Sequence, residues 1–298
     1  MRAARRPETG PGTVRTNAKK AGPLLSVVIP VRNGMPYISE AIASVLEQMT
    51  DDMELIVRDN LSTDGTTEYL AAIEDPRVQV VRAETPGSVG TSWSATCSLA
   101  RGTYTKLLCA DDTLLPGGLA RQLSGAVAHP DAVLVASRRR IIDETGRVVM
   151  PRHGLSRLTG QRSGRVATAR AIASGGNPFG EPSSVLFRTD ALRAALPFSE
   201  DAMYLVDVDM YLRVLREGAF LGLPSIDATF RLSSTSWSYE IGRAQLRQFR
   251  AWRDGLIARR EIVVSRRAKV VSDAASVLRF AARRAVAGAS GLAGRRRR

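Results

Sequence analysis

The sequence predicts an α/β protein built on a doubly wound, mostly parallel sheet, with a helical C-terminal extension. Short apolar runs alternate with segments whose apolar residues recur at helical spacing, a rhythm typical of parallel sheets covered by helices on both faces. The first run, residues 24–31, is apolar except for Ser26, as expected for a strand buried on both faces. With 298 residues and 44% hydrophobic content, the chain is long enough for a large core.

The expected elements follow in order along the chain. Each expected strand is a short apolar run, and each expected helix has apolar residues three or four positions apart. The strands are residues 24–31, 53–57, 78–81, 105–110 and 132–136. The helices are residues 37–46, 66–73 (after an N-capping turn at 62–65), 91–100 and 117–128. The second half adds a loop over 151–165, helices over 166–174 and 207–217, and strands over 184–187 and 228–232.

The net charge of +14 is concentrated at the two ends of the chain. Residues 1–23, rich in Arg, Gly, Pro and Thr, are expected to form a disordered basic leader. Residues 241–298 carry sixteen basic and three acidic side chains, whereas residues 26–240 carry 21 basic and 25 acidic ones. A nucleic-acid-binding fold would carry its basic residues on the domain itself, among stacking aromatics. We therefore expect no nucleic-acid partner, one folded domain over 24–240, and a separate basic extension over 241–298.

Cysteine content and hydropathy indicate a cytoplasmic protein. The two cysteines, Cys97 and Cys109, cannot staple a chain of this length, so a reducing compartment is expected. Cys109 is expected to be a small core residue, because no histidine stands in a plausible partner motif. No apolar stretch approaches membrane-spanning length, and no signal-peptide core follows the basic N-terminus.

Two neighbouring carboxylates, Asp111 and Asp112, end the apolar run 105–110. Like charges at the edge of a core resist desolvation unless something positive lies beside them. A magnesium ion that holds phosphate oxygens would supply that charge; the alternative is a solvated acidic turn. In doubly wound sheets, ligands bind beyond the carboxyl ends of the strands. Residues 58–61 and 111–113 both follow strands, so they are expected to converge on one crevice.

Five segments carry a family resemblance. They are SVVIPVRN at 26–33, LIVRDNLSTDGT at 55–66, RGTYTKLLCADD at 101–112, EPSSVLFR at 181–188 and DVDMYLR at 207–213. In this order and spacing they resemble the signatures of family 2 glycosyltransferases, an inverting group with the GT-A nucleotide-diphospho-sugar transferase fold. Each motif alone is weak, and the resemblance covers residues 26–238. It implies a transferase that moves a sugar from a nucleotide-diphospho-sugar to an acceptor hydroxyl.

The resemblance also implies roles for single residues at the donor side. Asp59 would accept a hydrogen bond from the nucleotide base, and the turn from Pro30 to Asn33 would line the base and ribose. Asp112 would bind Mg²⁺ or Mn²⁺ directly, while Asp111 would contact ribose or a metal-bound water. The cation would neutralise the nucleoside diphosphate as it leaves, which is Lewis-acid assistance.

The resemblance implies that Asp207 is the general base that deprotonates the acceptor hydroxyl. A single displacement with one base inverts the stereochemistry, whereas retention would need a second, nucleophilic carboxylate. Asp209 is the alternative base; two residues apart on a helix, the two side chains point to different faces. The spacing of four residues from Asp207 to Tyr211, the aromatic position that packs this helix in the family, favours Asp207.

The sequence departs from the family pattern at several positions. Arg32 replaces the usual aromatic residue and could stack on a base or contact phosphate. Ser233 stands where a histidine is common, so hydroxyls and Arg231 are expected to serve in its place at the donor. Asn60 and Leu61 replace the Asp and Gly of many members, which alters the donor pocket without removing Asp59.

The basic C-terminal region supports two interpretations. Two helices are expected, residues 242–260 and a second one after Glu261, with arginines at 243, 247, 250 and 253 on one face of the first. The second helix has apolar residues roughly on one side, namely Val263, Val270, Ala274, Val277, Ala281 and Ala285. Such a helix could lie on an anionic membrane surface, which suits a lipid-linked or envelope glycan as acceptor. It could equally pack on the domain with a solvated basic surface.

Two other classes of function stay open on sequence grounds. A nucleotidyltransferase of related fold would act on sugar phosphates, but residues 31–34 offer one glycine and one arginine rather than a Gly-rich phosphate cradle. A non-catalytic protein that binds membrane or nucleic acid through its basic ends would not need Asp112, and its binding would collapse with salt.

Overall fold

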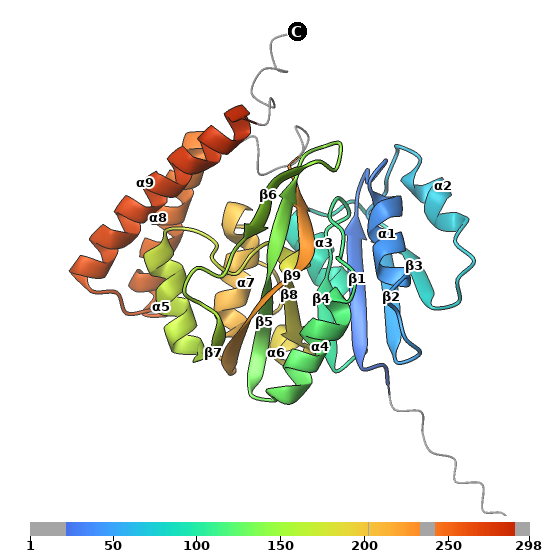
Figure 1. The fold of residues 1–298 in the computed structure, drawn as a ribbon, viewed down its shortest axis with the longest axis horizontal. Helices are drawn as coiled ribbons and strands as arrows, with labels where there is room; N and C mark the ends of the chain where they lie inside the picture. The colour runs from blue at the N-terminus through green and yellow to red at the C-terminus, as the bar shows by residue number, and fades with distance from the viewer. Residues whose placement is uncertain (1–21, 202, 233–241, 290–298) are drawn as a thin grey trace, which may run out of the picture.

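A nine-stranded sheet runs through the centre of the protein in the computed structural model (Figure 1), which describes residues 22–201, 203–232 and 242–289. The strand order is β3-β2-β1-β4-β8-β5-β9-β7, and β6 pairs with β5 off this path. The strands are β1 (Leu25–Val31), β2 (Met53–Asp59), β3 (Val78–Arg82), β4 (Tyr104–Leu107), β5 (Ala132–Ile142), β6 (Val148–His153), β7 (Gly160–Ser163), β8 (Val185–Arg188) and β9 (Ala219–Arg231). The predicted leader 1–23 and Ser233 lie largely or wholly outside the described residues.

Parallel pairing brings the ends of the N-terminal strands to one edge of the sheet. Strand β1 pairs in parallel with β2 and β4, with Val31 opposite Asp59 and Val28 opposite Leu107. Strand β5 pairs in parallel with β9, whereas β8 runs antiparallel to both β4 and β5. The sheet is therefore mixed. Its path through β3, β2, β1 and β4 is parallel, whereas β8 runs antiparallel to its neighbours.

Helices cover both faces of the sheet, as the doubly wound pattern predicts. Helices α1 and α4 pack one face with Ile42, Val45 and Leu119, while α3, α5, α6 and α7 contribute to the cluster on the other. The helices are α1 (Ile38–Leu46), α2 (Thr66–Ala71), α3 (Val89–Ser98), α4 (Gly118–Ala128), α5 (Gly164–Ser174), α6 (Thr189–Ala195), α7 (Val206–Val214), α8 (Gly242–Ala258) and α9 (Arg266–Ala289). No helix in these ranges combines the length and the apolar character needed to cross a bilayer.

The expected loop over 151–165 is wrong, because strands β6 and β7 lie there. Strand β6 forms a hairpin with the extended end of β5, and β7 pairs antiparallel with β9. All four residues of β7 are exposed and none is large and apolar, so no burial pattern marks this strand in the sequence. Backbone pairing to an existing sheet edge, rather than side-chain burial, forms it.

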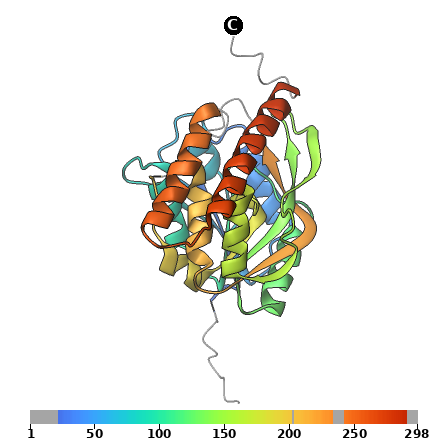
Figure 2. The ribbon, with the colours of Figure 1, turned by 90° about the vertical axis from the view of Figure 1, so that its left-hand side faces the viewer.

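Both predicted C-terminal helices are present, and they lie side by side on one flank of the molecule, orange and red in Figure 2. The side chains of Phe249, Trp252 and Leu256 of α8 belong to the same hydrophobic cluster as Tyr211 of α7. Arg253, one of the four arginines predicted to share a basic face, is 1% exposed. It forms ion pairs with Asp254 and Asp273 and so joins α8 to α9.

Close backbone contact fixes helix α9 against α5. Gly175 ends α5 in the left-handed region, at φ +70°, and a Cβ built there would lie 2.3 Å from the backbone N of Ser276. Only glycine combines this φ with so close an approach.

Gly175→Ala should therefore lower the free energy of unfolding by more than about 1 kcal/mol, because α9 must move away. Gly146→Ala is the matched control: its φ is +82°, but nothing lies within 4 Å of the added Cβ. Urea denaturation of the two variants separates steric displacement of α9 from backbone strain alone. Equal losses of unfolding free energy in both variants would show that the close contact between α5 and α9 does not require glycine at position 175.

Candidate active site

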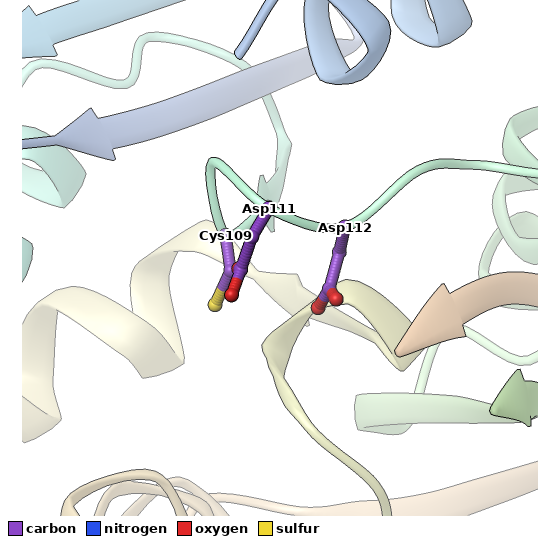
Figure 3. Close-up of side chains that lie close together, drawn as sticks. All are labelled: Cys109, Asp111 and Asp112. Carbon is purple, nitrogen blue, oxygen red and sulfur yellow. The ribbon is translucent and has the colours of Figure 1, made fainter. Parts of the chain in front are cut away.

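The turn after β4 brings three ligand-bearing side chains together. The sulfur of Cys109 and a carboxylate oxygen of each of Asp111 and Asp112 lie within 4.8 Å of one another. Figure 3 shows the three side chains leaving the turn on the same side. The backbone N–H of Asp112 donates to the Cys109 carbonyl at 3.1 Å, which closes the turn. The prediction that Cys109 is a small core residue is therefore wrong. Cys109 lies beside both carboxylates instead.

Asp112 is 1% exposed, and each of its carboxylate oxygens accepts one hydrogen bond. Oδ1 accepts from the backbone N–H of Arg231 at 2.9 Å, and Oδ2 accepts from the hydroxyl of Ser183 at 2.7 Å. Burial, followed by the charge of Asp111, raises the pKa of Asp112 well above its ordinary value. Burial also raises the pKa of Asp111. The protein on its own thus leaves this pair short of positive charge.

Arg231 holds the acidic turn from the end of β9. Its guanidinium donates to the Asp111 carbonyl at 2.9 Å, forms an ion pair with Glu40 at 2.5 Å and lies 4.3 Å from the centre of the Tyr37 ring. The side chain is 2% exposed, so these protein groups occupy it. Its charge opposes the upward pKa shift of Asp111. The predicted contact of Arg231 with the donor stays a prediction.

A second cation, Lys106, lies beneath the turn with no solvent exposure. Its ammonium donates to Gln122 Oε1 at 2.7 Å and to the Ser183 carbonyl at 2.5 Å. Burial lowers the pKa of Lys106 to about 7, against the raising effect of Asp227 and Asp112. Through Ser183, which bonds both groups, Lys106 and Asp112 belong to one buried network.

The residues of the turn fit a hard divalent cation. Mg²⁺ and Mn²⁺ prefer oxygen ligands, and Mg²⁺ is commonly bound by one or two carboxylates together with substrate phosphates. Asp111 and Asp112 supply such oxygens. A bound cation would stabilise the charged forms of these carboxylates, which burial disfavours. Burial raises the pKa of the Cys109 thiol well above its usual value, and a soft sulfur ligand suits Mg²⁺ and Mn²⁺ less well than carboxylate oxygens do.

Four carboxylates act electrostatically on the Cys109 thiol. After burial, the charges that raise its pKa are those of Asp112, Asp111, Asp207 and Glu181, in decreasing order. The predicted base on α7 and the predicted metal ligands after β4 therefore share one electrostatic environment. Glu181 is neutralised separately, by an ion pair with the buried Arg139.

Asp207 and Asp209 have different partners, although both lie in the first turn of α7. Asp207 is partly exposed, and its Oδ2 accepts a hydrogen bond from the side-chain amide of Asn177 at 2.7 Å. Asp209 is 8% exposed; its carboxylate accepts from Trp252 Nε1 at 2.8 Å and pairs with Arg213 at 2.9 Å. Asp209 therefore joins α7 to α8, while the charge of Asp207 acts on Cys109 in the acidic turn.

A cleft of about 490 Å³ opens beside the end of β1. The end of β1, the start of α3 and the segment before α7 line it, with Pro30, Arg32, Asn60, Trp93 and Glu200 among the lining residues. Two of the predicted donor-binding residues, Pro30 and Arg32, are thus in the cleft wall. The carboxylates of the acidic turn are not among its lining residues.

Asp59 and Asn33 lie next to this cleft and organise the loop after β2. Asp59 is 2% exposed; one carboxylate oxygen accepts from Ser62 and the other from Thr67. Asn33, at φ 55°, accepts through its side-chain oxygen from the backbone N–H of Thr63 at 2.9 Å. In this structure both residues bond to their own protein, and their contact with a nucleotide stays a prediction.

Sequence reasoning missed Lys106, Asn177 and the position of Cys109 beside the carboxylates. A lysine inside an otherwise apolar strand was a signal, because such a charge is buried only when it has partners. Ser183 lies in a segment that the resemblance marked, without a role. Asn177 carried no signal, because its contact with Asp207 spans thirty residues of sequence.

Residues 26–195 match the sequence model of Glycosyl transferase family 2. EpsE of Bacillus subtilis (strain 168), whose name marks it as a proposed glycosyltransferase, is 26% identical over 74% of this chain and 76% of EpsE. TuaG of the same organism, named as a proposed teichuronic acid biosynthesis glycosyltransferase, is 35% identical over 34% of this chain. The chain spans less than two thirds of the length of several curated relatives, 41% in the case of TuaG.

Solved structures share the fold at low sequence identity. TarS of Staphylococcus aureus in complex with UDP-GlcNAc aligns with a TM-score of 0.58 and 17% identity, over 85% of this chain and 70% of that one. The mannosyltransferase PcManGT of Pyrobaculum calidifontis in complex with GDP-Man and Mn²⁺ aligns with a TM-score of 0.57 and 17% identity, over 92% and 77%. The predicted GT-A fold is confirmed. With more than half of its residues matched by the family model, the chain belongs to glycosyl transferase family 2.

Proposed function

We propose that this protein is a metal-dependent, inverting glycosyltransferase that moves a sugar from a nucleotide-diphospho-sugar to an acceptor hydroxyl. The observation that carries the proposal is the acidic turn at the end of β4, where Asp111 and Asp112 lie beside Cys109 and the charge of Asp207 also acts on that thiol, while a cleft opens at the end of β1. Family membership supplies the reaction class. The donors named for TarS and PcManGT, UDP-GlcNAc and GDP-Man, support a nucleotide-sugar without selecting one.

Asp111 and Asp112 would hold Mg²⁺ or Mn²⁺, which would stabilise the negative charge on the departing diphosphate. Arg231 and Ser183 fix the position of Asp112 by donating to its two oxygens. Their bonds orient the carboxylate before any ligand arrives, which lowers the reorganisation cost of binding. The Mn²⁺ named in the PcManGT complex supports this role for the acidic turn.

Asp207 would accept the proton of the attacking acceptor hydroxyl. The amide of Asn177 donates to its Oδ2, and the backbone N–H of Val208 donates to its Oδ1 at 2.7 Å; these bonds orient the carboxylate. A retaining double displacement needs a second, nucleophilic carboxylate. Glu181 is the other carboxylate of the cluster, and its ion pair with Arg139 makes it a weak nucleophile. This pairing favours a single, inverting displacement.

We propose a glycan of the cell envelope, polymeric or lipid-linked, as the acceptor. The printed name of TuaG, which refers to teichuronic acid biosynthesis, supports an envelope polymer. A nucleotide-sugar donor supports a cytoplasmic location, and a lipid-linked acceptor would bring the enzyme to a membrane surface.

Asp112→Asn should abolish transfer and the Mn²⁺-dependent part of nucleotide binding, because the amide removes the charge that holds the cation. Differential scanning fluorimetry with UDP or GDP, with and without Mn²⁺, measures the second effect, since a ligand of the native state raises Tm. Without metal the variant should be at least as stable as the wild type, because like-charge repulsion with Asp111 is gone. A Mn²⁺-dependent Tm shift that persists in Asp112→Asn contradicts the proposed ligand.

Asp207→Asn should lower kcat by about 10²–10⁴-fold, the range for loss of a general base. Donor affinity should be unchanged, because the residue acts in the chemical step. Asp209→Asn is the matched control on the same helix: it should lower Tm through the weakened Arg213 contact and keep kcat within a few-fold. The reverse ranking of kcat losses would assign the base to Asp209.

The Tm increase caused by Mn²⁺ should grow with pH. The pKa of Asp112 is raised in the folded protein, so without metal the folded state holds a proton that the unfolded chain releases near pH 3.8. Stability without metal therefore falls as pH rises from that value through the raised pKa, while deprotonation opens the site to the cation. Scanning fluorimetry across this window tests the sign. Two results would contradict this prediction. One is a Mn²⁺-induced Tm increase of the wild type that stays constant with pH, and the other is a pH dependence of that increase equal to that of Asp112→Asn.

A further inference from the structure

Helix α9 packs on the protein through its polar side. Ser272 and Ser276 are its buried residues, 0% and 4% exposed. The Ser272 hydroxyl donates to the Ile172 carbonyl at 2.7 Å, and Arg279 Nε donates to the Ser174 carbonyl at 2.7 Å. Hydrogen bonds to the end of α5 thus hold the inner face.

The outer face of α9 is apolar. Val270, Val271, Val277 and Leu278 are 68%, 56%, 44% and 70% exposed. Ala274 and Ala281 are exposed between and after them. Recurring at intervals of three and four residues, these side chains form one stripe along the helix. Single exposed apolar residues are ordinary, but a contiguous stripe marks a contact surface.

Basic residues accompany this stripe without free carboxylates nearby. Arg266 and Arg267 are exposed at the start of α9. Residues 241–298 include only three acidic side chains against sixteen basic ones. In the described part of the chain, Asp254, Glu261 and Asp273 all form ion pairs with Arg or Lys. The outer side of α9 is therefore both apolar and cationic.

We infer that the outer face of α9 binds a membrane surface that contains anionic phospholipids. The apolar stripe would enter the boundary between headgroups and acyl chains, and the arginines would contact lipid phosphates. Figure 2 shows α9, in red, on the outermost layer of its flank, with no element covering it. A second copy of this chain is a poorer occupant, because stripe-to-stripe contact would bring the basic residues of both copies together.

This surface lies outside the transfer site, and its binding does not depend on the proposed reaction. The test is flotation of the full-length protein with vesicles of phosphatidylcholine alone, or of equal parts phosphatidylcholine and phosphatidylglycerol, without donor or metal. Wild-type protein should float with the anionic vesicles and at least tenfold less with the neutral ones. Binding should weaken with salt.

Val271→Asn combined with Leu278→Asn should reduce flotation with anionic vesicles at least tenfold. The matched control is Val127→Asn combined with Val166→Asn, which changes two valines of α4 and α5 that are 55% and 41% exposed. The control should bind as the wild type does. Because all four positions are exposed, circular dichroism and Tm should show that both variants fold.

Three results would overturn the inference. They are absence of wild-type binding to anionic vesicles, equal binding by the α9 variant, and a dimer in light scattering that the α9 variant dissociates. The last would identify a second copy as the occupant. If the wild-type protein floats with anionic vesicles but shows no transfer activity, only the proposed reaction is contradicted.

Discussion

Two adjacent carboxylates at a strand end, Asp112 buried and Asp111 half-buried, determine much of the surrounding structure. Asp112 is satisfied by groups from β9 and from the short turn before β8, while Arg231 reaches the Asp111 carbonyl and is itself paired with Glu40 of α1. Four parts of the chain that are far apart in sequence therefore meet at one turn. The pKa values of both acids stay raised despite these contacts, chiefly because of burial, and the charge of Asp111 adds electrostatic repulsion at Asp112. A fold that tolerates this repulsion keeps a place for a cation.

The two acids of α7 show how local partners assign roles to similar residues. The Trp252 indole and the Arg213 guanidinium both bind Asp209, so this carboxylate joins α7 to α8. Asp207 accepts a hydrogen bond from the side-chain amide of Asn177, and its charge acts on Cys109 of the acidic turn. Helical spacing alone placed them on different faces; only the packing of α8 distinguishes the supporting residue from the candidate base.

The first half of the fold could be predicted because most of its strands are buried on both faces and so appear as apolar runs; β3 is more exposed but still carries three valines. Strands β6 and β7 could not, because exposed residues at a sheet edge leave no such pattern. The acidic turn could be predicted from Asp111 and Asp112, but the Asn177 contact depends on tertiary packing. The orientation of α9 was equally hidden: its apolar residues suited either a membrane surface or packing on the domain, whereas in the structure Ser272 and Arg279 donate to carbonyls at the end of α5.

The shared core of α7 and α8 has a consequence for the boundary at residue 240 that the charge pattern suggested. Phe249, Trp252 and Leu256 complete a cluster that includes Tyr211. A chain shortened at that boundary would expose apolar side chains along α7. It would also remove the Trp252 indole that donates to Asp209. A chain without α8 would need polar residues on the surface thus exposed, so α8, together with α9 packed against it, contributes to the stability of the domain.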